Sequence, residues 1–235
     1  FIFLYLFIAI LNSTIVQSFL AAKVSDYFSK EWRAKVSIGG LEIRPLLTVG
    51  LKDVYLENPQ KDTVATIEYL EASLKNFEFT KGLEFSNVRL DNVNFTLAIE
   101  NHKLNLSFII DYFKSDKPKE KKEKAPYVIK VDRCKLNNVN FSLDLNDTPT
   151  PIPEFGVAIN HMQYNQINGV LDEIVVINDS INVNIKRFST KERSGVTLKN
   201  LKGKFIVSPK GITCRSMQVQ TEESNLKLYA SIKTD

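Results

Sequence analysis

Apolar and polar residues alternate one by one along much of this 235-residue chain. In the stretch 93–99, the apolar side chains Val93, Phe95, Leu97 and Ile99 occupy every second position. The same spacing recurs in 104–110, 139–145, 181–185 and 226–232. Because successive residues of a strand face opposite sides, this period of two predicts half-buried β-strands with one apolar and one wet face.

Short turn signals such as Gly39-Gly40 separate the expected strands, and no helical segments of 10–15 residues alternate with them. This arrangement favours a long, twisted antiparallel sheet over a βαβ fold. After residue 33 the one candidate helix is 108–114, although part of it also fits the strand alternation. The sequence leaves both interpretations of that segment open.

A weak internal repeat supports one large sheet. Residues 90–97 (LDNVNFTL) match residues 136–143 (LNNVNFSL), and 51–56 and 198–203 are looser copies. The spacing of the copies is irregular, which excludes a solenoid of fixed period. Two residues between Leu and Val interrupt the alternation as a β-bulge does, and bulges bend and twist a sheet.

The N-terminal stretch carries no charge before Lys23. The uncharged stretch 1–22 would reach about 33 Å as a helix, enough for a hydrocarbon core of about 30 Å. We expect the transmembrane helix to occupy residues 1–15 and to continue upstream of Phe1. A cleaved signal peptide is the alternative, but neither a basic n-region nor an A-x-A-like site is present. The expected membrane-anchor residues are Phe1, Phe3, Leu4, Leu6, Phe7, Ile8, Ile10 and Leu11.

Residues 16–33 have apolar side chains at helical spacings and predict an amphipathic extension of that helix. It packs either on the first strands as an end cap, the simpler arrangement, or in the bilayer interface with Trp32 as an anchor. The local charges do not settle the membrane orientation. The Lys- and Glu-rich segment 114–125 predicts a flexible, solvated loop, with contact to anionic headgroups as the alternative.

Composition argues against most site chemistry. The 31 basic and 27 acidic residues leave a net charge of +4, too balanced for a nucleic-acid reader. Cys134 and Cys214 stand far apart without metal-ligand spacing, so they are either small buried side chains, which we favour, or a disulfide. His102 and His161 are isolated. No catalytic, metal or cofactor motif is present, so we do not expect an enzyme, and we expect no cofactor.

The order of short sequence patterns resembles the N-terminal portion of TamB-like proteins, the translocation and assembly module subunit, within the AsmA-like group. The resemblance covers essentially the whole chain and rests on many weak patterns. They lie in 18–29, 34–43, 51–58, 61–64, 77–79 and 104–113, together with the L-x-N-V-N-F units.

This resemblance implies a single-pass inner-membrane protein whose body lies in the periplasm. It implies that residues 34–235 form a β-groove domain, a sheet curled like a taco into an open, apolar-lined groove, which continues beyond residue 235. Such a groove would conduct phospholipid acyl chains between the inner and outer membranes. A partner barrel in the outer membrane would link the protein to outer-membrane protein assembly.

Two functions therefore remain open, a lipid conduit and a structural tether or scaffold that docks the barrel. In a scaffold the alternating face is ordinary core, whereas in a conduit it is an exposed surface that needs a ligand. The candidate groove-lining residues are Val93, Phe95, Leu97, Ile99, Leu104, Leu106, Phe108, Phe141, Leu143, Ile181, Val183, Ile185, Phe205, Val207, Leu226, Leu228 and Ile232.

Overall fold

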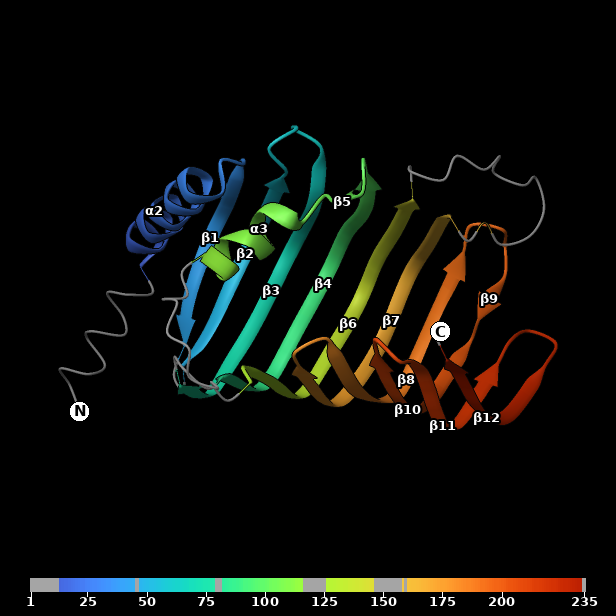
Figure 1. The fold of residues 1–235 in the computed structure, drawn as a ribbon. Coiled ribbons are helices and arrows are strands. Elements are labelled where there is room, and N and C mark those ends of the chain that lie inside the picture. Colours follow the sequence, from blue (N-terminus) through green and yellow to red (C-terminus); the bar gives the residue numbers. More distant parts are fainter. Residues whose placement is uncertain are drawn as a thin grey trace, which may run out of the picture.

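The protein is mainly β and forms one open, unclosed sheet (Figure 1). The computed structural model describes residues 13–44, 47–78, 82–115, 126–145, 158 and 160–233. The strands are β1 (Val36–Arg44), β2 (Thr48–Glu57), β3 (Thr63–Glu78), β4 (Gly82–Glu100), β5 (Lys103–Leu104), β6 (Val128–Leu145), β7 (His161–Ile177), β8 (Ser180–Glu192), β9 (Thr197–Leu198), β10 (Asn200–Ser208), β11 (Gly211–Gln220) and β12 (Asn225–Lys233). The helices are α2 (Thr14–Trp32) and α3 (Ser107–Ser115).

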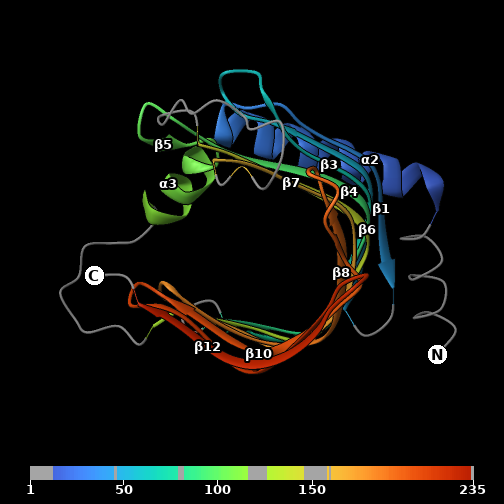
Figure 2. The same cartoon turned by 90° about the vertical axis from the view of Figure 1, so that its right-hand side faces the viewer.

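The sheet follows the order β1-β2-β3-β4-β6-β7-β8-β10-β11-β12, with β5 beside β4 and β9 beside β8. Figure 2 shows that the strands bend, so that an upper and a lower part of the sheet join along one side and leave the other side open. The described strand β1 lies at one end of the sheet and β12 at the other. The expected mainly β chain with one large, unclosed sheet is confirmed.

The expectation of a wholly antiparallel sheet is wrong at one place, because β4 and β6 pair in parallel. β5 and α3 follow β4 in the chain, and β6 then begins at the end of the sheet where β4 begins. A crossover of this length is what a parallel pair requires, whereas a short turn would reverse the strand. The turn signals in the sequence did not reveal this crossover.

The parallel pairing places the two copies of the repeat side by side and in register. Leu90 lies opposite Leu136, Val93 opposite Val139, and residues 94–97 continue the match. Within the copies, Asn92 and Asn138 adopt the left-handed conformation, with φ of 49° and 52°. The side-chain amide of Asn138 donates to Asn92 at 2.7 Å. The predicted irregularity between Leu and Val is therefore a conformational feature shared by neighbouring strands.

We expect Asn138→Ala to destabilise the protein by about 1–2 kcal/mol more than Asn138→Gly. Both substitutions remove the bond to Asn92, but only Ala meets a steric penalty at a positive φ. Urea denaturation followed by circular dichroism measures the difference. Equal losses of stability would contradict a left-handed conformation at this position.

Helix α2 packs on the first strands. Ala21, which is 1% exposed, contacts Ile38 and Leu41 of β1, and Leu20 and Val24 pack around this cluster. The helix ends at Trp32 because Arg33 adopts a left-handed conformation with φ of 50°. This packing agrees with the end-cap interpretation of residues 16–33.

Two serines of α2 also bind the backbone of β1. The N–H of Val36 donates to Oγ of Ser29 and the N–H of Ile38 donates to Oγ of Ser25, both at 2.9 Å. Ser29 in turn donates to the carbonyl of Val36 at 3.0 Å. Unpaired edge-strand groups invite pairing with other chains, so α2 protects this edge of the sheet.

The predicted membrane anchor cannot be compared with the structure, because the eight anchor residues lie outside the described residues. In the described part of the chain, no helix combines the length and apolar character that crossing a membrane requires. Most of the predicted loop 114–125 likewise lies outside the described residues.

The segment 104–110 is a correction to the strand alternation. Only Lys103–Leu104 is strand, and the chain enters α3 at Ser107, as the helix candidate 108–114 predicted. The carbonyl of Leu106 accepts bonds from the N–H groups of Ile109 and Ile110, at 3.1 and 3.3 Å. Phe108 and Tyr112, four residues apart and thus on one helix face, both contact the Trp32 ring. These contacts with α2 decide the segment in favour of helix.

Candidate functional site: the apolar face of the sheet

Apolar side chains from neighbouring strands line up in rows across the sheet, and we call the surface that they form the apolar face. In one row, Ile67 of β3 lies opposite Val93 of β4, which lies opposite Val139 of β6, which lies opposite Ile167 of β7. A second row continues from Phe95 through Phe141 to Tyr164. Because these rows run across the strands, the apolar face extends from strand to strand along the sheet.

The middle of the apolar face is well buried. Val93, Val139 and Ile167 are 4%, 9% and 6% exposed, and Phe95 and Phe141 stack with ring centroids 6.0 Å apart. Every residue assigned to this cluster belongs to a strand. Strand side chains therefore bury one another here.

The predicted groove-lining residues fall into three groups. Val93, Phe95 and Phe141 belong to the central cluster. Towards the ends of β4 and β6, Leu97 lies opposite Leu143, and Ile99 pairs with Leu104 of β5. Leu106 and Phe108 are not strand residues, since they lie in the turn before α3 and in α3 itself.

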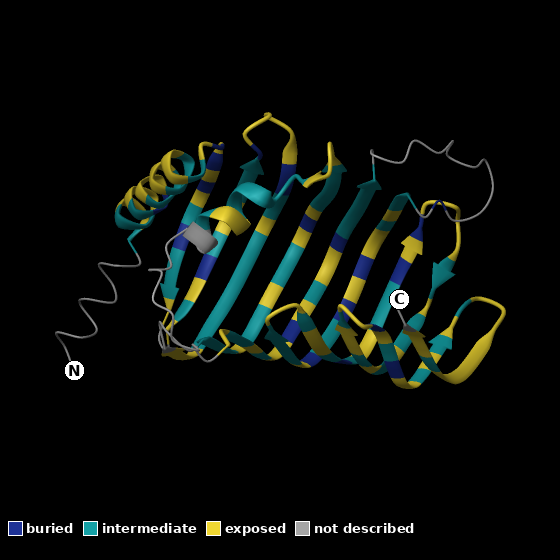
Figure 3. Ribbon diagram, viewed as in Figure 1, coloured by how far each residue is buried: buried dark blue, intermediate teal, exposed yellow. Residues whose placement is uncertain are grey.

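The third group lies on β8 to β12 and is more exposed. Val183 lies opposite Phe205, Ile185 opposite Gly203, and Ile181 opposite Val207. Leu226 and Leu228 pair with Val219 and Met217, and Ile232 with Ile212. Ile232 is 65% exposed, and Leu226 is 52% exposed. Figure 3 shows the same contrast, with buried residues along the middle of the sheet and mostly exposed ones in the last hairpin.

Several residues of the apolar face were missed from the sequence. They are Ile67, Leu90, Leu136, Tyr164, Ile167 and Phe188, all packed with the central cluster. Leu90 and Leu136 open the two repeat copies, so the repeat held a signal for them. The others lie in β3, β7 and β8, where bulges shift the pairing and obscure the alternation.

Both cysteines are free and buried, as the favoured interpretation predicted. Cys134 pairs in register with Leu171, and Cys214 with Phe205, so both belong to rows of the apolar face. Burial raises the pKa of Cys134 to about 11, which keeps its thiol protonated at neutral pH. A buried, protonated thiol is a poor nucleophile.

The opposite face of the sheet carries polar ladders. The amide of Asn137 donates to Asp91 at 2.5 Å, and that of Asn140 donates to Asn94 at 2.9 Å. Arg133 donates to Asp172 at 2.9 Å, and this bond holds the pKa of the Asp172 carboxyl below its usual value. Asn94 is exposed as expected, but Asn184 is only 8% exposed, so a wet-face pattern does not guarantee solvent contact.

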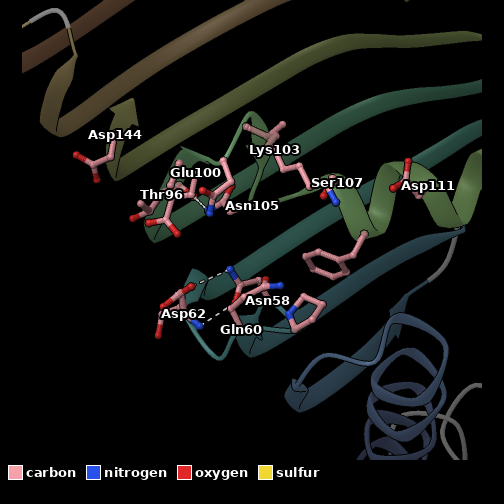
Figure 4. Close-up of a pocket in the computed structure, with 16 residues that line it drawn as sticks. Asn58, Gln60, Asp62, Thr96, Glu100, Lys103, Asn105, Ser107, Asp111 and Asp144 are labelled. Atoms are coloured by element: carbon pink, nitrogen blue, oxygen red, sulfur yellow. Dashed lines mark hydrogen bonds between the residues drawn. The ribbon is translucent and has the colours of Figure 1, made fainter. Parts of the chain in front are cut away.

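A polar cavity of about 630 Å³ lies beside α3 at the rim of the sheet (Figure 4). The turn between β2 and β3 forms one wall, where Asn58 donates to Asp62 at 3.0 Å. Among the described residues that line this cavity there are four with carboxyl groups and one cation, Lys103; the four are Asp62, Glu100, Asp111 and Asp144. Within the described ranges, no group of three His, Cys, Asp or Glu side chains is placed to bind a metal ion. The cavity is thus chemically unlike the apolar face.

Searches against protein-family models and against curated proteins found no match to this chain.

Proposed function

We propose that the apolar face lines the inside of the curled sheet and that this groove holds and conducts the acyl chains of phospholipids. The observation that carries the proposal is a row of apolar side chains that continues in register from β4 to β12 and ends in exposed residues on β11 and β12. The row consists of Leu83, Ile129, Val176, Ile181, Val207, Ile212 and Ile232. Exposed apolar side chains that gather at one end of a face mark a binding site for a partner or ligand.

The burial pattern supports placing the apolar face inside the curl. Side chains converge on the inner side of a bent sheet and diverge on the outer side. Val93 and Val139 are buried in a cluster whose described members are strand residues, whereas Asn92 and Asn94, on the same strand as Val93, are exposed. The apolar residues of the central cluster therefore behave as inner residues.

The energetics of such a groove require no specific contact to the lipid. Each buried CH₂ group contributes about 0.8 kcal/mol, so an acyl chain lying along the rows is held by its length alone. A site of this kind lets a chain slide from one row to the next without breaking a strong bond. The expected anchor at 1–15 would hold one end of the groove at the inner membrane, with the body in the periplasm, as in the TamB-like proteins that the sequence resembles.

Site-specific photocrosslinking tests the proposal. A benzophenone side chain in place of Phe95 or Val183 is expected to capture phospholipid from cells, because both positions lie on the apolar face. Asn94 and Asn182 are matched controls, since each is an exposed neighbour with its side chain on the other face. Mass spectrometry of the adducts measures capture. Equal capture at the test and control positions would refute the conduit.

A further inference from the structure

The ladder on one side of β8 is interrupted. Residues 181–185 pair with β10, and Thr190 and Lys191 pair with β9. Between them, residues 187–189 have register partners on β7, and the described ladders give 186–189 none on the β9/β10 side. The start of β10, residues 200–202, pairs with β11. A cavity of about 580 Å³ lies at this interruption, and we call it the β8–β10 window.

Four basic residues line the window: Lys186, Arg187, Lys199 and Lys202. None of its described lining residues is Asp or Glu. Asp172 interacts electrostatically with Lys186, but its carboxylate already accepts a hydrogen bond from Arg133 at 2.9 Å. In the described part of the chain, no ion pair involves any of these four cations. Uncompensated cations around one cavity attract an anion.

The window also reaches the apolar face. Phe188 and Leu136 both line the window, and both pack with the central apolar cluster. Arg187 and Ser189 flank Phe188 in the strand, so their side chains lie on the opposite face. The window is therefore bordered by Arg187 and Ser189 from one face of the sheet and by Phe188 and Leu136 from the other.

We infer that the β8–β10 window binds a phosphate group. Lys and Arg are the usual partners of phosphate oxygens, and the amide of Asn200 supplies a further donor. The amides of Asn137 and Asn168 already donate to Asp91 and to the carbonyl of Gln166. The volume lies in the range of small-molecule sites. The inference rests on the proposed function where the phosphate belongs to a lipid headgroup whose acyl chains lie on the apolar face. Free phosphate shares the same chemistry.

The test compares the 235-residue chain with the double variant Lys199→Gln/Lys202→Gln. Lys191→Gln/Lys227→Gln is the control, since it removes the same charge from exposed lysines outside the window. The probes are dihexanoyl phosphatidic acid, dihexanoylglycerol and inorganic phosphate, with affinities measured by isothermal titration calorimetry. Phosphatidic acid and diacylglycerol share their acyl chains and differ only in the phosphate.

We expect the unaltered chain to bind the phosphatidic acid about tenfold more tightly than the diacylglycerol. The window variant should lose this preference while it still binds diacylglycerol, and the control variant should keep it. Equal affinities for the two lipids in the unaltered chain, together with no binding of inorganic phosphate, would overturn the inference and leave the proposed function standing.

The inorganic phosphate arm separates the two possible sources. If neither lipid binds, but phosphate binds the unaltered chain and not the window variant, then the proposed function fails and the window is a free-phosphate site. If the window variant weakens neither phosphatidic acid nor inorganic phosphate relative to the control, the inference is wrong.

Discussion

Replacing Ala21 with Asp is expected to detach α2 from the sheet and to lower the free energy of unfolding by about 3–5 kcal/mol. Ala21 is 1% exposed and contacts Ile38 and Leu41, so the new carboxylate would be buried without a partner. Once α2 leaves, the N–H groups of Val36 and Ile38 lose their serine acceptors. The uncovered β1 edge should then pair with other molecules.

Ala22→Asp is the matched control, because Ala22 is the next residue of the same helix and is exposed. It should leave both stability and oligomeric state close to those of the unaltered chain. Urea denaturation measures stability, and size-exclusion chromatography with light scattering measures self-association. Similar behaviour of the two variants would show that α2 does not protect the β1 edge.

Replacing Ile167 with Ala is expected to lower the free energy of unfolding by about 2–4 kcal/mol. Ile167 is 6% exposed and packs with Val93 and Val139, so truncation leaves a cavity in the central cluster. Ile232→Ala should cost less than about 1 kcal/mol, because Ile232 lies on the same face but is 65% exposed.

This comparison tests whether the apolar face is packed core along its whole length. If the apolar face were core along its whole length, as in a pure scaffold, both substitutions would destabilise the protein by similar amounts. A conduit requires a larger loss of stability at Ile167 than at Ile232, because its apolar face must be accessible towards β12. Urea denaturation of both variants provides the measurement.

The alternation of apolar residues was sufficient to predict the strands and one large sheet, because burial on a single face imposes a period of two. It was insufficient at 104–110, where Leu104, Leu106 and Phe108 keep the alternating spacing but Phe108 and Tyr112 also share a helix face. Contact with Trp32, which lies far away in the sequence, selects the helix. Local pattern alone does not contain that contact.

Pairing partners were harder to predict than strands. The match between 90–97 and 136–143 indicated reuse of one strand type, but did not show that the copies lie side by side in parallel. The β8–β10 window was missed for a related reason. Lys186 lies in β8 and Lys199 lies between β9 and β10, and their cavity exists only because the ladder between β8 and β10 is interrupted. Such sites arise from pairing, which sequence periodicity does not specify.

The parallel pairing of β4 with β6 has a consequence for how the chain is made. The residues of β4 that pair with β6 have their partners 46 positions further along the chain, as Asp91 has in Asn137. These partners are therefore synthesised later than β4. At about 5–20 residues per second, a ribosome needs about 2–9 s to supply that partner. During this interval the edge of β4 that will pair with β6 is open. The β6 segment of a second nascent chain carries the same repeat copy and can pair there in place of the chain's own β6. The crossover is thus the step at which crowded synthesis would exchange strands between molecules.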